Sequence, residues 1–482
     1  MHRKAKHQNR RPQISRRPAQ DDRVRDLVLD AYARVLREGG YASDLLAQAF
    51  RRREDLGPRA RATANRRLFG MIHLARKLDF ALEAAGARLT RDTEVYAKYV
   101  AFRLLKQEIS IEEAREALPV VNWKAVAEID AAIARESSPV LRLALKCSLP
   151  DLLAERFLEE YGDEAEALGS ALNEAATQTL RANTLKVTRA ELAERLTASG
   201  VETRSTRFAP HGLSLSLDAE PKDRSADMLR SARSSGLFEP QDEGSQLVSE
   251  LAACALRAFL KHASAKTGFG FEETGGIAVD FCAGAGGKTL PLGAAMNNRG
   301  RLFALTLKHH DYDELRRRAD RAGLENLTPV LIERNTLPRE LHSVRGKAIC
   351  VLVDAPCSGV GALRRKPEVR WRITAEALQR LPAEQLDILK QAARLCAPGG
   401  YLIYATCTVL RAENEAVAAE FLNQSREFAL VSARTLFETV LPKKGAARVT
   451  DATGQYLKLL PHQQGTDGFF AAVFQKSPEG HS

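Results

Sequence analysis

Residues 277–296 have the sequence IAVDFCAGAGGKTLPLGAAM, an apolar segment, a glycine-rich turn and a helix-forming segment in direct succession. This order predicts a buried strand at 277–281, a turn at 282–288 and a helix at 289–296. Strands followed by helices over much of the remaining chain are typical of a parallel sheet in a doubly wound α/β domain. Such sheets bind ligands at the carboxyl ends of their strands. The further segments of this pattern are strands at 302–307, 329–332, 348–353 and 401–405 and helices at 312–322 and 375–395.

The length and composition set the broad class of the protein. The 482 residues correspond to two to four domains at roughly 100–200 residues each. Lysine and arginine total 72 against 61 acidic residues, a net charge of +11, which favours a polyanionic partner although many basic proteins bind none. No apolar run approaches the ~20 residues of a membrane span, and the first residues lack the apolar core of a signal peptide. We therefore expect a soluble, cytoplasmic protein without a membrane partner.

The cysteines argue against a metal site. There are seven, and no two of them form a CxxC pair or lie in the His-rich context of a zinc site. We expect reduced thiols, most of them in the core, and no bound metal.

Composition divides the chain into four segments. Residues 1–20 contain seven Lys or Arg and no acid, which predicts a disordered basic arm. Apolar residues at three- and four-residue spacing predict an all-α domain over 21–147. Short strands alternate with helices over 148–240, which predicts a small α+β module. Residues 241–482 contain the α/β pattern described above.

The glycine-rich turn is compatible with several ligands. Gly287-Lys288-Thr289 ends like a phosphate-binding P-loop, but Cys282 stands where that motif requires glycine. A dinucleotide fingerprint would require glycine in place of Thr289. A third interpretation is S-adenosylmethionine held over the turn, with Asp280 supporting the loop. A purely structural turn remains the alternative to all three.

Two cysteines follow two of the predicted strands. Cys357 lies just after strand 348–353, and Cys407 directly follows the end of strand 401–405 within Thr406-Cys407-Thr408. Because the carboxyl ends of parallel strands meet at one edge of a sheet, we expect both thiols at the same edge as the glycine-rich turn.

The chain resembles the NOL/NOP/Sun family of RNA cytosine-5 methyltransferases, and most of all its bacterial RsmB-type (Sun/Fmu) members. The resemblance implies a Rossmann-like, S-adenosylmethionine-dependent methyltransferase domain at the C-terminus. It also implies that the α+β module binds RNA and that the helical front is a NusB-like RNA-binding domain. The motifs that carry the likeness are QDEGSQ at 241–246, the turn at 280–289, DAPCSGVG at 354–361, LRRKPE at 363–368 with Trp371, TCT at 406–408, ENE at 413–415 and TDGFF at 466–470.

The resemblance assigns roles to three catalytic residues. Carbon 5 of cytosine is a poor nucleophile, so a thiolate must add at carbon 6 before carbon 5 can accept a methyl group. In the family the nucleophile is the cysteine that corresponds to Cys407, and the cysteine that corresponds to Cys357 assists release. Asp354 would bind the base. The cofactor residues that we expect are Cys282, Ala283, Gly284, Ala285, Gly286, Gly287, Lys288, Thr306, Arg334 and Asp354.

Two positions depart from the family pattern. Thr306 stands where an acid usually holds the ribose of the cofactor, and Arg334 where an acid lies beside the adenine. The alternative function is therefore a noncatalytic RNA-binding or ribosome-assembly factor with a degenerate cofactor site.

The segment after the Cys357 motif is strongly basic. We expect it to bind RNA phosphates and to stack a base on Trp371. The domain order implies that the substrate is ribosomal RNA, 16S RNA in particular, and we expect a monomer. The predicted RNA-binding residues are Arg364, Arg365, Lys366, Arg370 and Trp371.

Overall fold

The computed structural model describes residues 20–478 except 54, 216–222, 268–275 and 334–338. The basic arm predicted at 1–20 lies outside the described residues except for Gln20, which begins helix α1. Within the described ranges, no helix combines the length and apolar character needed to cross a membrane.

The front of the molecule is built from helices alone, as predicted. Their apolar faces form one core in which Val28, Leu68 and Phe102 are buried. Local signals fix individual helix starts: the Ser110 hydroxyl accepts from Glu113 N at 3.1 Å, and the Glu113 carboxylate accepts from Ser110 N at 2.7 Å. The helices are α1 (Gln20–Glu38), α2 (Ala42–Arg52), α3 (Pro58–His73), α4 (Ala75–Ala84), α5 (Arg91–Leu105), α6 (Ile111–Ala117), α7 (Trp123–Ala127), α8 (Ile129–Ala134) and α9 (Pro139–Cys147).

A small α+β module follows. Its four-stranded antiparallel sheet has the order β2-β3-β1-β4. The apolar side of this sheet packs on α12 through residues such as Leu180, Leu192 and Leu213. The elements are α10 (Asp151–Tyr161), α11 (Ala165–Ala171), β1 (Thr179–Ala182), α12 (Arg189–Ala198), β2 (Thr203–Ser205), β3 (Gly212–Leu215), α13 (Asp223–Ser234) and β4 (Phe238–Pro240).

The last domain contains an eight-stranded sheet. Seven strands follow the order β10-β12-β9-β8-β5-β6-β7, and β11 pairs with β12. Strands β7, β6, β5, β8 and β9 are parallel neighbours, as the sequence predicts. The strands are β5 (Ile277–Asp280), β6 (Arg301–Thr306), β7 (Leu327–Leu331), β8 (Ala348–Asp354), β9 (Cys396–Thr406), β10 (Phe428–Val431), β11 (Leu457–Leu459) and β12 (Phe469–Lys476).

Strand β12 is the exception to the predicted parallel sheet. It runs antiparallel between β9 and β10. Residues 469–474 are all buried. Both faces of the strand are therefore covered, and a continuous apolar run carries no signal of strand direction.

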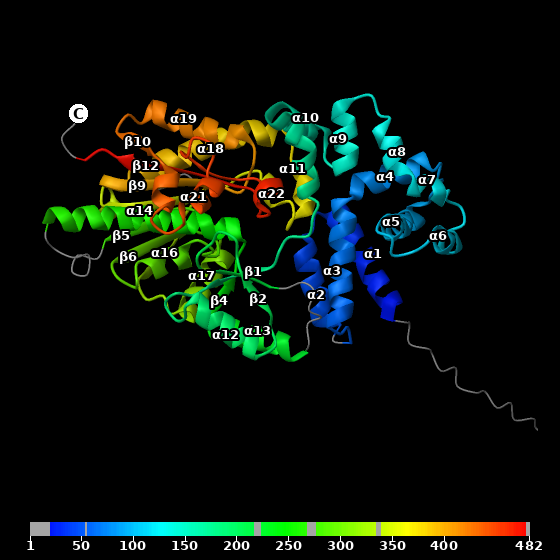
Figure 1. The fold of residues 1–482 in the computed structure, drawn as a ribbon, viewed down its shortest axis with the longest axis horizontal. Helices are drawn as coiled ribbons and strands as arrows, with labels where there is room; N and C mark the ends of the chain where they lie inside the picture. Colours follow the sequence, from blue (N-terminus) through cyan, green and yellow to red (C-terminus); the bar gives the residue numbers. More distant parts are fainter. Residues whose placement is uncertain (1–19, 54, 216–222, 268–275, 334–338, 479–482) are drawn as a thin grey trace, which may run out of the picture.

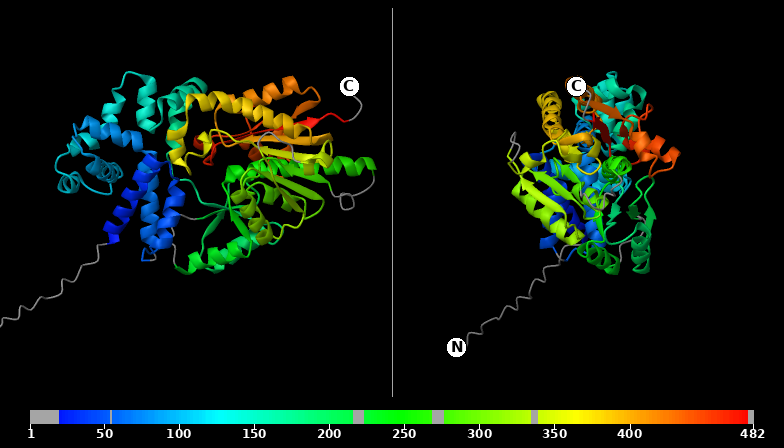
Figure 2. Two further views of the ribbon diagram at one scale, coloured as in Figure 1. Left: turned by 180° about the vertical axis from the view of Figure 1, so that it is seen from behind. Right: turned by 90° about the vertical axis from the view of Figure 1, so that its left-hand side faces the viewer.

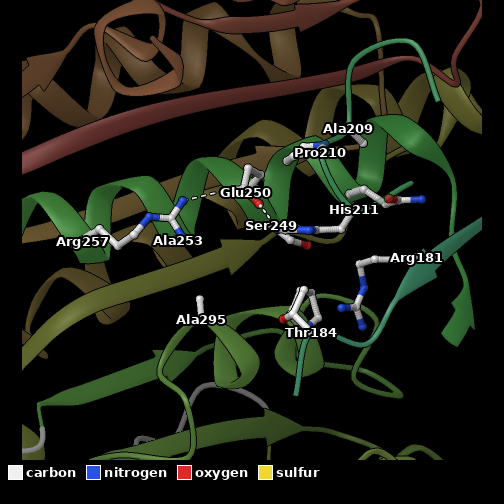
Figure 3. A pocket seen from close by; sticks show the side chains of 12 residues that line it. Arg181, Thr184, Ala209, Pro210, His211, Ser249, Glu250, Ala253, Arg257 and Ala295 are labelled. Atoms are coloured by element: carbon white, nitrogen blue, oxygen red, sulfur yellow. Dashed lines mark hydrogen bonds and ion pairs between the residues drawn. The ribbon is translucent and has the colours of Figure 1, made fainter. Parts of the chain in front are cut away.

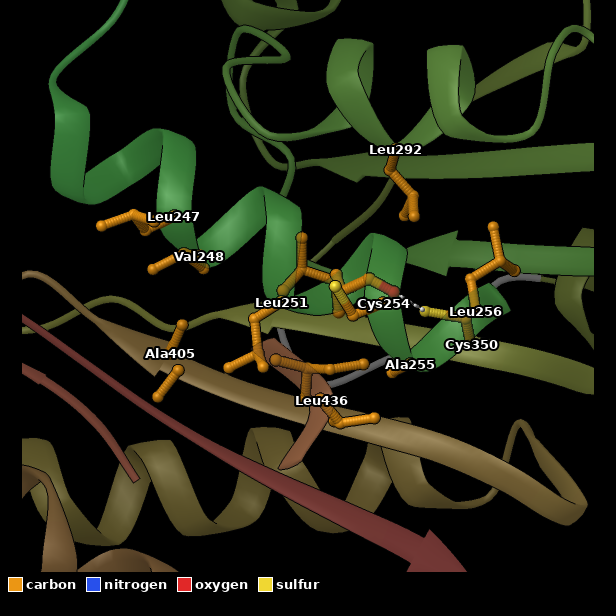
Figure 4. Close-up of a cluster of buried hydrophobic side chains, with 14 of the residues drawn as sticks. Leu247, Val248, Leu251, Cys254, Ala255, Leu256, Leu292, Cys350, Ala405 and Leu436 are labelled. Carbon is orange, nitrogen blue, oxygen red and sulfur yellow. Dashed lines mark hydrogen bonds between the residues drawn. The ribbon is translucent and has the colours of Figure 1, made fainter. Parts of the chain in front are cut away.

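Helices cover both faces of this sheet. On one face, α14 contributes Leu247 and Leu251 to a core shared with Leu292 of α16 and Ala405 of β9 (Figure 4). On the other face, Leu389 of α18 packs against the alternate residues of β8 and β9. The helices are α14 (Glu243–Thr267), α16 (Thr289–Ala295), α17 (His309–Ala322), α18 (Ala375–Ala393), α19 (Glu415–Gln424), α20 (Ala433–Phe437), α21 (Lys443–Val449) and α22 (Pro461–Gln464).

The helical front lies at one end of the molecule and the eight-stranded sheet at the other, with α10 and α11 between them (Figures 1 and 2). Leu149 and Phe157 pack against Leu363 and Val409, which belong to the loops after β8 and β9. The start of the small module, with α10, thus stabilises the two loops that follow the predicted catalytic strands.

Candidate active site

The structure brings the two predicted thiols together. Cys407 follows the last residue of β9, and Cys357 lies three residues beyond β8. These strands pair in parallel, with Asp354 opposite Ala405, and the two Sγ atoms are 3.4 Å apart. The hydrogen bond from Cys357, opposed by burial and helped by the Lys288 cation, lowers the pKa of Cys407. The same hydrogen bond and burial raise the pKa of Cys357 well above its usual value. The lowered pKa gives Cys407 more thiolate character than Cys357.

An ion pair between buried Lys288 and half-buried Asp354 lies beside the thiols. Lys288 Nζ donates to Asp354 Oδ2 at 2.6 Å and lies 5.3 Å from the centre of the Phe469 ring. Burial opposes the charge of Lys288, but the Asp354 carboxylate outweighs it and raises the lysine pKa. The ion pair joins the glycine-rich turn to the end of β8 and places a cation near the Cys407 sulphur.

Glu413 holds the loop that carries Cys357. Its buried carboxylate accepts from Ser358 N at 2.8 Å, from the Ser358 hydroxyl, and from Gln385 Nε2 at 2.9 Å. Gln385 also donates to Pro356 O at 3.0 Å. The residues on both sides of Cys357 are thus fixed by one network anchored in α18 and the start of α19.

Asn414 fixes the loop that carries Cys407. It accepts from the Thr406 hydroxyl at 2.6 Å and donates to Thr408 O at 3.1 Å. The loop also approaches Gly361, where a Cβ would lie 2.9 Å from Cys407 O and 2.2 Å from the carbonyl oxygen of Gly468, just before β12. Any larger residue at 361 would therefore force these segments apart.

The glycine-rich turn fits a ligand that lies over it. A Cβ at Gly284 or Gly287 would meet nothing within 4 Å, so this side of the turn is open. On the far side, Arg318 donates to Ala285 O at 2.7 Å and Gln241 donates to Gly287 O at 2.9 Å. Hydrogen bonds therefore fix one side of the turn, while the side at Gly284 and Gly287 is open to a ligand.

Asp280 lies beneath this turn, as predicted. One of its oxygens accepts from the Thr289 hydroxyl at 2.7 Å, and the other is buried without a partner in the described residues. Burial raises the pKa of Asp280 to about 6. The free oxygen is consistent with a polar ligand at the turn.

Thr306 is at the end of β6, next to the turn. It is buried, and its hydroxyl has no hydrogen-bond partner within the described ranges. Leu307, the next residue, is 51% exposed. The site therefore offers a single hydroxyl where a ribose-binding acid would stand. Arg334, the other position that departs from the family pattern, lies outside the described residues.

Two of the five predicted RNA-binding residues are buried in this structure. Arg370 is 0% exposed and donates to Asn173 Oδ1 at 2.7 Å and to Ser148 O at 3.0 Å. Arg364 is 6% exposed and donates to Gly465 O at 2.7 Å. Both guanidiniums join segments distant in sequence and have no free surface for a phosphate.

The other three residues differ in exposure. Arg365 forms ion pairs with Asp242 and Asp467, each at 2.8 Å. Trp371 packs against the core of the helical front, and its Nε1 has no partner in the described chain. Lys366 is exposed. Lys366 is therefore the most exposed of the five, while Arg365 and Trp371 are half-buried.

The supporting roles of Glu413, Asn414 and Gln385 were not predicted, and neither was the pairing of Lys288 with Asp354. All of them depend on contacts between separate segments. The ENE motif at 413–415 marks the place of Glu413 and Asn414, but spacing along the chain gives no signal for Gln385 in the middle of α18.

The comparisons with known proteins agree with this geometry. Residues 272–475 match the family described as 16S rRNA methyltransferase RsmB/F, and residues 149–219 match its ferredoxin-like domain. The chain is 28% identical to the probable ribosomal RNA small subunit methyltransferase B of Bacillus subtilis, over 94% of this chain and 98% of that protein. It is 30% identical to the protein of the same name from Synechocystis, over 70% of this chain and 69% of that protein. The crystal structure of PH0851 has the same fold, with a TM-score of 0.70 and 23% identity over 94% of this chain and 98% of that one.

Proposed function

The chain belongs to the RsmB/F family of 16S rRNA methyltransferases, and we propose that it methylates carbon 5 of a cytosine through a covalent bond to Cys407. The observation that carries this proposal is the cysteine pair, with its sulphurs 3.4 Å apart beside the Lys288–Asp354 ion pair. A methyltransferase that acts on an oxygen or on an exocyclic nitrogen has no need of two adjacent thiols. Carbon 5 of a pyrimidine requires one thiolate to activate it.

The residues of the site divide the reaction between them. Cys407, the thiol of lowered pKa, adds to carbon 6 of the cytosine, and carbon 5 then becomes electron-rich. Asp354, at the end of β8, contacts the base edge and stabilises the charge that develops on the ring. S-adenosylmethionine, when bound, supplies an electrophilic methyl group to carbon 5. Cys357 assists loss of the carbon 5 proton, and the bond to Cys407 then breaks.

The glycine-rich turn is the proposed place of the cofactor. The open front of Gly284 and Gly287, the unpartnered oxygen of Asp280 and the unpartnered hydroxyl of Thr306 all support a polar ligand there. The neighbouring residues Cys282, Ala283, Ala285, Gly286 and Lys288 complete the turn.

Replacement of each cysteine tests the proposal. Cys407→Ala should abolish incorporation of a methyl group into small-subunit ribosomal RNA. Cys357→Ala should form an adduct with RNA that persists on a denaturing gel. Cys396→Ala, which removes a buried thiol from the other end of β9, is the matched control and should retain turnover. Full turnover by Cys407→Ala would refute the nucleophile assignment, and bisulfite sequencing of the product would identify the cytosine.

One observation favours a second function. Thr306 provides no carboxylate for a ribose, which would suit a noncatalytic RNA-binding or ribosome-assembly factor. Calorimetric titration with S-adenosylmethionine separates the two functions. Heat of binding that saturates supports the enzyme, and absence of heat at millimolar ligand supports the binding factor.

A further inference from the structure

A second cavity lies between the small module and the sheet domain, and none of its lining residues belongs to the cysteine site (Figure 3). Its volume is about 120 Å³. Arg181 reaches it from β1, His211 from the turn before β3, and Gln246, Glu250 and Arg257 from α14. We call it the Arg181 cavity.

Arg181 is the buried polar group of this cavity. It is 5% exposed, and its Nε donates to Gln241 Oε1 at 2.9 Å. The described residues provide no ion pair for this arginine and no acceptor for its two terminal nitrogens. Buried polar groups usually have partners, so these nitrogens point to a ligand.

The acids near Arg181 are already paired with other cations. Glu239, opposite Arg181 in the β1–β4 pair, forms ion pairs with Arg318 at 3.2 Å and Arg321 at 2.6 Å. Glu250 of α14 is bound to Arg257 at 2.5 Å and faces His211 at 3.7 Å, and these two basic side chains, each 43% exposed, form the rim. Burial lowers the pKa of Arg181 to about 10, although Glu239 and Glu250 oppose this shift. The excess of cations over acids favours an anion.

We propose that the Arg181 cavity binds a phosphate group. The planar guanidinium matches two phosphate oxygens. The cavity volume of about 120 Å³ is enough for one phosphate group. The phosphate is either part of an RNA backbone or a free ion from solution. The first interpretation rests on the proposed function.

Thermal unfolding of the full chain in inorganic phosphate tests the site itself. At constant ionic strength, phosphate should raise the Tm of the wild type and of Arg204→Met, an exposed arginine of the same small sheet. Phosphate should not raise the Tm of Arg181→Met. An equal Tm shift in all three proteins would overturn the proposal. Should Arg181→Met not fold, a crystal of the wild type grown in phosphate decides: phosphate bonded to Arg181 supports the site, and its absence from the cavity overturns it.

RNA binding identifies the source of the phosphate. If the ligand is RNA, Arg181→Met weakens binding of a 16S RNA fragment about tenfold and lowers the slope of log K against log salt by about 1. Inorganic phosphate then competes with this RNA for the wild-type protein. If RNA affinity is unchanged while the Tm shift is lost, the ligand is a free phosphate. The proposed function is measured separately, by adduct formation at Cys407, so its failure is distinguishable from failure of this site.

Discussion

Glu413 offers a test of how the Cys357 loop is held. Glu413→Ala removes the acceptor of Ser358 N, Gln385 Nε2 and the Ser358 hydroxyl. Two buried N–H groups lose their partners, at about 1–3 kcal/mol each, so we expect the free energy of unfolding to fall by about 4 kcal/mol. Glu413→Gln is the matched control. Its carbonyl can accept from both N–H groups while its NH₂ donates to the Ser358 hydroxyl, so the loss should be only about 1 kcal/mol.

The loop position should also affect turnover. With its anchor lost, Cys357 no longer stays at 3.4 Å from Cys407, so Glu413→Ala should accumulate the RNA adduct as Cys357→Ala does. Urea denaturation gives the stability, and the fraction of RNA-bound protein on a denaturing gel gives the adduct. A loss below about 1 kcal/mol in Glu413→Ala, or adduct levels equal to those of Glu413→Gln, would refute the positioning role.

Three further predictions follow from single residues. Arg370→Met leaves several buried carbonyls without donors and should lower the free energy of unfolding by about 3 kcal/mol or more in urea; a change like that of the exposed Arg380→Met would contradict the burial account. Thr306→Asp should raise S-adenosylmethionine affinity by about one to two decades in calorimetry, because a carboxylate can accept from both ribose hydroxyls; unchanged affinity would place the ribose elsewhere. The Asp280 pKa of about 6 exceeds its ordinary value of 3.8, so the folded state holds this proton more tightly and wild-type stability should fall by about 2 kcal/mol from pH 4 to pH 6 relative to Asp280→Asn; parallel stability curves for the two proteins would be inconsistent with that pKa.

Much of the sheet domain was predictable because its signals are local. The apolar run before Asp280 and the glycines after it fix a strand, a turn and a helix within twenty residues. The parallel sheet then places the ends of β8 and β9 together. For this reason the meeting of Cys357 and Cys407 could be expected before any coordinates were known.

The burial of two predicted RNA-binding residues could not be foreseen, because the tertiary structure determines it. Arg364 and Arg370 occur in a run of cations that is typical of a solvated loop. In the fold, Arg370 lies next to the residues that follow α9 and α11. Its guanidinium donates to the carbonyl oxygens of Ser148 and Leu172 instead of to water. Packing of the helical front against the loop gives no local signal in the sequence. The roles of Glu413 and Gln385 could not be predicted either, because they depend on contacts between segments distant in sequence.

Peptide mapping of the RNA adduct tests the central claim most directly. Cys357→Ala is incubated with small-subunit ribosomal RNA and S-adenosylmethionine, the adduct is digested with protease and nuclease, and the modified peptide is sequenced by mass spectrometry. The account predicts a methylated cytidine nucleotide joined to the sulphur of Cys407. A nucleotide attached to any other residue, or methylated RNA released without an adduct, would contradict it.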